Sequence, residues 1–250
     1  MSGEAPQKIP QRDSSRPFAT THWSVVLAAG HSSSPECRQA LSSLCESYWY
    51  PLYAYVRRRG HSVEEAQDLT QAFFAFLLEK DALRVADRER GRFRAFLLAA
   101  LHNFLANEWR RAHAERRGGH RLQLALDFDS GERRYSLEPA DEMTPERIFE
   151  RRWALVLLER AMDRLRRQYE SGGKAALFAA LKPYLGGGGE ILSHEEVARR
   201  LGVTAGSVKV AVHRLRRRCR ETLRQEIAQT VGSPDEVDDE LRELFTALGS

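Results

Sequence analysis

Apolar residues recur three or four positions apart along most of the chain, which is the spacing of an amphipathic helix. No stretch convincingly keeps the alternation of apolar and polar residues that indicates a half-buried strand. The pattern therefore predicts an all-α protein. The expected helices cover residues 20–30, 34–60, 63–80, 93–117, 145–170, 174–185, 194–201, a stretch that begins at 205, and 235–249.

The places where this periodicity fails divide the chain into two small helical domains joined by a flexible linker. Residues 1–19 are polar and rich in Pro and Ser, which is typical of disorder. Residues 119–144 mix turn residues with scattered apolar ones, and only "LQLALDF" within them suggests a short strand. We expect a disordered tail (1–19), a first helical domain (20–118), a linker (119–144), a second helical domain (145–228) and an acidic amphipathic tail (229–250).

The second domain contains a helix-turn-helix pattern. Ser193 can cap the helix over 194–201, a Gly202–Val203 turn follows, and Thr204 can cap the next helix. The positions expected in its core are Val197, Ala198, Leu201, Val203, Val208, Val212 and Leu215. The positions expected to face outward are Ser207, Lys209, Val210, His213, Arg214 and Arg217. An exposed basic face on such a frame suits the major groove of DNA, and a solvated basic helix is the alternative.

Charge is distributed unevenly, although the net charge is only +4. Residues 84–121 hold ten arginines against four acids, whereas residues 233–250 hold six acids against one arginine. Such asymmetry indicates a polyanion at one surface and a different partner for the tail.

Several classes of protein are not expected. No apolar run approaches the ~20 residues of a membrane span, and the first residues lack the apolar core of a signal peptide. The three cysteines fit no disulfide framework, and we expect Cys219 to be a small core residue in a cytoplasmic protein. His22, His31, Cys37 and Cys45 lack a zinc spacing. No catalytic motif stands out, so we expect no enzyme, cofactor, metal or small-molecule substrate.

Two motifs carry a resemblance to a known family. "LSHEEVARRLGVTAGSVKVAVHRLRRR", from Leu192 to Arg218, resembles the promoter-binding C-terminal region of bacterial extracytoplasmic-function sigma factors. "YWYPLYAYVRRRGHSVEEAQDLTQAFFAFLLEK" and "GRFRAFLLAALHNFLANEWRRAHAERR" resemble the N-terminal domain of the same family, in the same order. The resemblance implies that the chain binds core RNA polymerase and promoter DNA.

The resemblance also implies roles for particular residues. The polymerase-binding set is Glu64, Glu65, Asp68, Leu69, Gln71 and Phe73. The set at the minus-ten element is Arg88, Arg90, Arg92, Asn103, Asn107, Trp109, Arg110 and Arg111, while the outward positions of the helix-turn-helix would read the minus-35 element. Trp109 would stack on a base, and the alternative is a partly buried core tryptophan.

The chain departs from the family in the stretch "EEAQDLTQAFF". Gln67 and Ala72 stand where the family usually has acids, which weakens the acidic face. Thr70 lies beside this gap, and phosphorylation there would restore about two negative charges. The alternative is a threonine chosen for packing. Control by a protein kinase or by an anti-sigma protein is therefore an open expectation.

The tail over 235–249 has an apolar stripe of Val237, Leu241, Leu244, Phe245 and Leu248. We expect it either to dock on the basic recognition surface as an autoinhibitor or to bind a partner. Two rival functions are a stand-alone helix-turn-helix regulator of duplex DNA and an arginine-rich RNA-binding or scaffold protein. The N-terminal motifs argue against the first rival, and the capped turn argues against the second.

Overall fold

The computed structural model describes residues 35–78, 92–114, 126–137, 143–186 and 192–249. Its elements are α2 (Pro35–Arg58), α3 (Val63–Leu78), α4 (Phe93–Ala114), α5 (Phe128–Tyr135), α6 (Pro145–Ser171), α7 (Ala175–Leu181), η3 (Lys182–Leu185), α8 (His194–Leu201), α9 (Ala205–Ala228) and α10 (Glu236–Gly249). Over the described ranges the only extended pairing is one isolated bridge, so the all-α expectation is confirmed. The expected tail over 1–19 and helix over 20–30 lie outside the described residues.

Helix α2 forms the centre of the first half. Tyr48 and every residue from Tyr50 to Val56 are buried, because α3, α5 and α6 all pack around this helix. A helix that is apolar on all sides must be covered on all sides. The next helix begins at the expected capping box, in which the Glu65 amide donates to Ser62 Oγ (3.1 Å) and the Ser62 amide donates to Glu65 Oε2 (3.0 Å).

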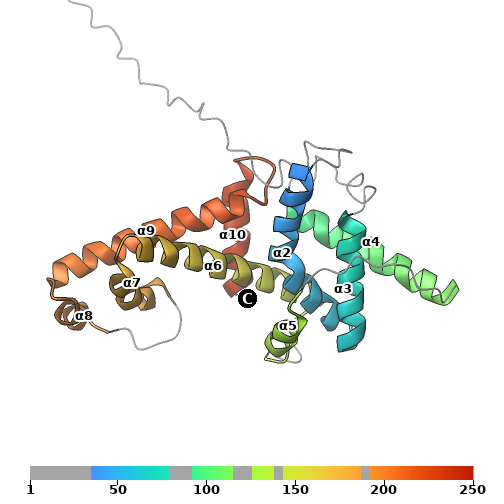
Figure 1. The fold of residues 1–250 in the computed structure, drawn as a ribbon, viewed down its shortest axis with the longest axis horizontal. Coiled ribbons are helices and arrows are strands. Elements are labelled where there is room, and N and C mark those ends of the chain that lie inside the picture. The colour runs from blue at the N-terminus through green and yellow to red at the C-terminus, as the bar shows by residue number, and fades with distance from the viewer. Residues whose placement is uncertain (1–34, 79–91, 115–125, 138–142, 187–191, 250) are drawn as a thin grey trace, which may run out of the picture.

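Two hydrophobic cores share the same pair of long helices. The larger core joins α2, α3 and α4 to Trp153 and Leu157 of α6, the end of α9, and α10. The smaller core joins the other end of α6 to α7, α8 and the start of α9, around Leu165 and Leu215. Figure 1 shows α6 and α9 side by side, with α7 and α8 at one end of the molecule and α3 and α4 at the other. Helix α6, which opens the second predicted domain, therefore contributes to both cores.

Helix α5 lies in the range expected as a linker, and Phe128, expected in a strand, begins it. Asp127 caps this helix by accepting a hydrogen bond from the Ser130 amide. Glu132 then anchors it to α2, because its carboxylate accepts from Arg57 at 3.0 and 3.1 Å and from the Tyr53 hydroxyl at 2.5 Å. The expected strand is wrong at Leu126–Phe128, and residues 122–125 lie outside the described part.

A glycine allows α5 to approach α2 closely. A Cβ atom at Gly131 would lie 2.9 Å from the Trp49 ring, closer than side-chain carbons normally come. The Trp49 ring also lies against Phe128, with ring centroids 5.7 Å apart and nearly perpendicular planes. The close contact therefore depends on the absence of a side chain at position 131.

Helix α10 packs against α6 and α9, and its Val237, Leu244 and Ala247 are buried there. The expected apolar stripe is largely correct, but Phe245 is 59% exposed. Docking on the recognition surface is wrong for this structure, because α10 lies against the second half of α9, far along that helix from the turn that precedes it (Figure 1).

Candidate nucleic-acid and polymerase interfaces

The turn between α8 and α9 has the geometry that the sequence predicts. Ser193 and Glu196 form a complete capping box at the start of α8. Gly202 ends α8 with φ = +67°, a left-handed conformation that glycine adopts readily. Thr204 then caps α9 by accepting from the Ser207 amide at 3.1 Å. Hydrogen bonds from the Ser193 backbone and then its side chain hold the pKa of Glu196 below its ordinary value, so the cap is charged at neutral pH.

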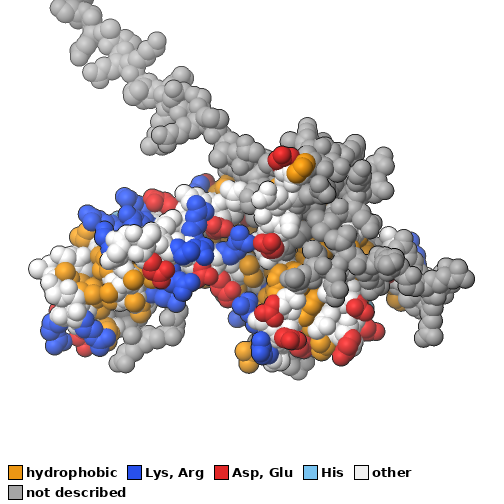
Figure 2. Space-filling model, viewed as in Figure 1, with side chains coloured by type: hydrophobic (Ala, Val, Ile, Leu, Met, Phe, Trp, Pro, Cys, Tyr) orange, Lys and Arg blue, Asp and Glu red, His pale blue; other side chains and the backbone are white. Residues whose placement is uncertain are grey.

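The predicted outward face of α9 is correct. Its members are all exposed: Ser207, Lys209, Val210, His213, Arg214 and Arg217. Val208, Val212 and Leu215 are buried on the opposite side against α6, α7 and α8, as expected. Val203 was expected in the core, but it is 47% exposed because it stands on the turn itself. Figure 2 shows Lys and Arg side chains on the end of the molecule that holds α8 and the start of α9.

A basic cavity beside this face adds one cation, Lys174, that the sequence pattern missed. It has a volume of about 490 Å³, and Lys174, Arg214 and Arg218 supply its cations. The Arg218 guanidinium lies over the Tyr169 ring, 5.5 Å from its centroid. Lys174 follows the Gly172–Gly173 turn between α6 and α7, and only the fold brings it next to α9. The neighbouring Arg216 instead donates to the Tyr184 carbonyl at 3.0 and 3.2 Å, which is a structural role.

Helix α4 presents the predicted minus-ten residues that the structure describes. Asn103, Asn107 and Arg110 are exposed. Trp109 is 66% exposed, so the alternative of a partly buried core tryptophan is wrong. Arg88, Arg90 and the side chain of Arg111 lie outside the described residues. Arg92 is described, but its guanidinium forms ion pairs with Glu240 (3.1 Å) and Asp239 (3.6 Å) of α10.

A groove of about 880 Å³ brings the two predicted sets of the first domain together. One side is lined by Glu65, Asp68 and Leu69 of α3, and the other by Leu105, Trp109 and Arg110 of α4. The lining mixes apolar and charged side chains, which suits a partner that offers both an apolar group and a charged backbone.

The polymerase-binding prediction for α3 is partly wrong. Glu64, Glu65 and Asp68 are exposed, and Figure 2 shows acidic side chains along the edge of the molecule that holds α3 and α5. Leu69 and Gln71 are half-buried. Phe73 cannot contact a partner, because it is completely buried against Phe74 and Phe104.

Thr70 is also completely buried, and its hydroxyl has no hydrogen-bond partner among the described residues. A kinase cannot reach a hydroxyl in this position unless α3 separates from its neighbours. The packing explanation therefore accounts for Thr70 in this structure, and the phosphorylation hypothesis finds no support in it.

Thr70→Val should raise the free energy of unfolding by about 1 kcal/mol, because it replaces a buried hydroxyl without a partner by a methyl group of similar size. Thr70→Ser, which keeps the hydroxyl and loses the methyl group, should lower it by about 1 kcal/mol. Urea unfolding followed by circular dichroism measures both. A less stable valine variant would mean that the hydroxyl has a partner after all.

Other chemistry has little support. Cys219 is half-buried against the smaller core, as expected, and burial raises the pKa of its thiol. Among the described residues no group of three His, Cys, Asp or Glu side chains is placed to hold a metal ion. The helices that the structure describes are each too short or too polar to cross a membrane.

Comparison with known proteins agrees with this geometry. The sequence model of the ECF sigma factor family matches residues 40–225, a range that runs from α2 into α9. No curated protein and no solved structure matches the chain. The match covers well over half of the chain and includes both the α3–α4 groove and the helix-turn-helix. The chain therefore belongs to the family of ECF sigma factors, which are not enzymes and which direct RNA polymerase to promoters.

Proposed function

We propose that the exposed face of α9 reads the minus-35 element of the promoter. The observation that carries this proposal is the arrangement of α9: six outward residues on a helix whose opposite side is buried and whose start is capped by Thr204. Arg214 and Arg217 reach phosphates or guanine edges, and Val210 offers an apolar contact to a thymine methyl group. Lys174 and Arg218 extend the cationic surface beside them.

The groove between α3 and α4 would serve the minus-ten element and the polymerase. Trp109 offers an exposed aromatic face on which an unpaired base can stack, and Asn103 and Asn107 lie on the same helix. The exposed acids Glu64, Glu65 and Asp68 would face a basic surface of the core polymerase. The site of action would be the cytoplasm, and an anti-sigma protein that controls it stays a prediction.

Arg214→Ala tests the assignment of α9. Neutralising one phosphate contact should reduce the slope of log affinity against log salt by about 0.9 for duplex DNA. Binding is measured by fluorescence anisotropy at several salt concentrations. Arg133→Ala is the matched control, because it removes the same charge from an exposed position on α5.

An equal loss of slope in both variants would overturn the assignment, because it would reflect net charge alone. Co-elution with core RNA polymerase provides the second measurement. Both variants should co-elute as well as the wild type, since position 214 lies outside the proposed polymerase surface. Duplex binding without co-elution by any of the proteins would favour the stand-alone regulator.

A further inference from the structure

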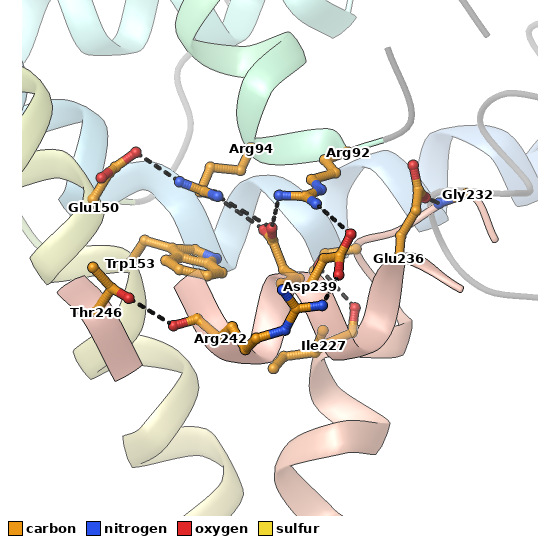
Figure 3. A network of polar contacts seen from close by, with 12 residues as sticks. Arg92, Arg94, Glu150, Trp153, Ile227, Gly232, Glu236, Asp239, Arg242 and Thr246 are labelled. Carbon is orange, nitrogen blue, oxygen red and sulfur yellow. Dashed lines mark hydrogen bonds and ion pairs between the residues drawn. The ribbon is translucent and has the colours of Figure 1, made fainter. Parts of the chain in front are cut away.

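A buried carboxylate joins the end of the chain to the start of α4. Glu240 of α10 is completely buried, and both of its oxygens accept hydrogen bonds from Arg94, Oε1 from Nε at 3.0 Å and Oε2 from Nη2 at 3.1 Å. Arg92 adds an ion pair from Nη1 to Oε2 at 3.1 Å. Figure 3 shows the guanidinium groups of Arg92 and Arg94 near each other, with Asp239 of α10 beside Arg92. Three charge-assisted contacts, from two guanidinium groups to a single buried carboxylate, are a strong arrangement.

The same cluster reaches two further helices. Arg94 donates to Glu150 of α6 at 2.7 Å, and its guanidinium lies 4.4 Å from the centroid of the Trp153 ring. Trp153 Nε1 in turn donates to the hydroxyl of Tyr48 on α2 at 3.0 Å. Burial, and then the charge of Glu240, raises the pKa of Tyr48, so its phenol stays neutral. Helices α2, α4, α6 and α10 thus meet at one polar centre.

The backbone closes the same junction. The Phe93 amide donates to the Thr230 carbonyl at 3.0 Å, and Arg92 pairs with Val231 as an isolated bridge. Glu236 then accepts from the amides of Gly232 and Ser233, which turns the chain into α10 directly after this contact. The segment after α9 is therefore attached to the first residues of α4.

The carboxylates of α10 bind guanidinium donors that a nucleic acid would otherwise contact. Arg92 is one of the arginines expected to bind phosphates at the minus-ten element, and a phosphate and a carboxylate compete for the same guanidinium donors. The side chains of Arg92 and Asp239 are 26% and 48% exposed, so this outer part of the cluster is open to an approaching phosphate. Arg94 and Glu240 lie deeper.

We propose that α10 is an intramolecular latch, in which Asp239 and Glu240 hold Arg92 until promoter DNA displaces them. This proposal rests on the proposed role of α4 at the minus-ten element. Helix α10 lies beyond residues 40–225, the range that the family model matches. DNA would approach at the half-buried Asp239–Arg92 pair and then compete with Glu240.

Glu240→Gln tests the latch in the full-length protein. The probe is a fluorescently labelled 20-nucleotide single strand, and anisotropy gives the affinity. Losing a charge-assisted contact to Arg92 should tighten binding by about tenfold. Asp239→Asn, at the outer, half-buried pair, should tighten binding by roughly twofold. Asp235→Asn is the control, because it removes one charge from an exposed position just before α10. Its affinity for the single strand should equal that of the wild type.

Combined variants separate the latch from the role of α4. Arg92→Ala in the Glu240→Gln background should remove the gain in affinity. If Glu240→Gln binds no more tightly while Arg92→Ala still weakens binding, the latch is wrong and α4 keeps its role. If Arg92→Ala changes nothing in either background, Arg92 does not bind the strand, and both the latch and the expected role of Arg92 at the minus-ten element are wrong. If circular dichroism shows that Glu240→Gln is unfolded, the Asp239→Asn variant tests the latch instead. An Asp239→Asn variant that binds the single strand no more tightly than Asp235→Asn would overturn the proposal.

Discussion

Trp153→Ala should lower the free energy of unfolding by about 3–5 kcal/mol, the range for removing a large buried aromatic side chain. Trp153 is 1% exposed, and it lies on α6 yet packs among residues of α2 and α4. Its removal leaves a cavity and deprives Tyr48 of a hydrogen-bond donor and Arg94 of the ring beneath it. The loss therefore falls on the joint between the two halves of the molecule.

Chemical denaturation followed by far-ultraviolet circular dichroism measures this loss. Trp109→Ala is the matched control, because the same substitution at a side chain that is 66% exposed should change stability by no more than about 0.5 kcal/mol. The control should weaken single-strand binding instead. A stability loss at Trp153 as small as the one expected at Trp109 would mean that α6 does not share the larger core.

Leu215→Ala should lower the free energy of unfolding by about 2–5 kcal/mol and also abolish duplex binding. Leu215 is completely buried in the smaller core, where it holds α9 against α7 and α8. A cavity there loosens the support of the recognition face without touching any outward residue. Val203→Ala is the control, since its side chain stands exposed on the turn and should change stability by about 0.5 kcal/mol at most.

The Leu215→Ala prediction is tested by comparing the stability of the variant with its affinity for duplex DNA. Stability is measured by urea unfolding and affinity by anisotropy with duplex DNA, both on the full chain. If Leu215→Ala unfolds earlier but binds duplex DNA as tightly as the wild type, the start of α9 does not read DNA. That result would contradict the proposed function directly, because a loosened α9 cannot present its outward residues in register.

The helix-turn-helix could be predicted in detail because its determinants are local. Ser193 and Glu196 cap one helix, Gly202 ends it in the left-handed conformation, and Thr204 starts the next. All of these interactions join residues three to five positions apart, so a short stretch of sequence contains them. The exposed face of α9 then follows from helical periodicity.

The sequence-based predictions fail where segments distant in the sequence determine whether a residue is buried or an element forms. Helical spacing along α3 predicts one apolar stripe, but α2 and α4 both pack against this helix, and Thr70 is completely buried as well as Phe73. Helix α5 is polar and short, and the side chains that anchor it, Arg57 and Tyr53, lie on α2 more than 70 positions earlier. No local pattern reveals such partners.

Arg92 shows that a local charge pattern also cannot reveal a partner from a distant segment. A run of arginines with few acids nearby in the sequence predicts a free cationic surface, and this prediction fails where the fold supplies an acid from elsewhere. Glu240 follows its partner Arg94 by 146 positions, so the charge pattern around α4 alone cannot show the pairing. The remaining expected residues of α4 that the structure describes are exposed, and their role in binding DNA stays a prediction.

The close contact between Gly131 and the Trp49 ring links two positions that evolution cannot vary independently. Any larger residue at 131 meets the indole within 3 Å, so its acceptance requires a smaller residue at 49 or a shifted α5. Homologous chains that retain this tryptophan should therefore retain glycine at the equivalent of 131, and a larger residue there should occur together with a smaller residue at the equivalent of 49. An aligned set of close homologues would reveal this as paired substitution between two segments that no local motif connects.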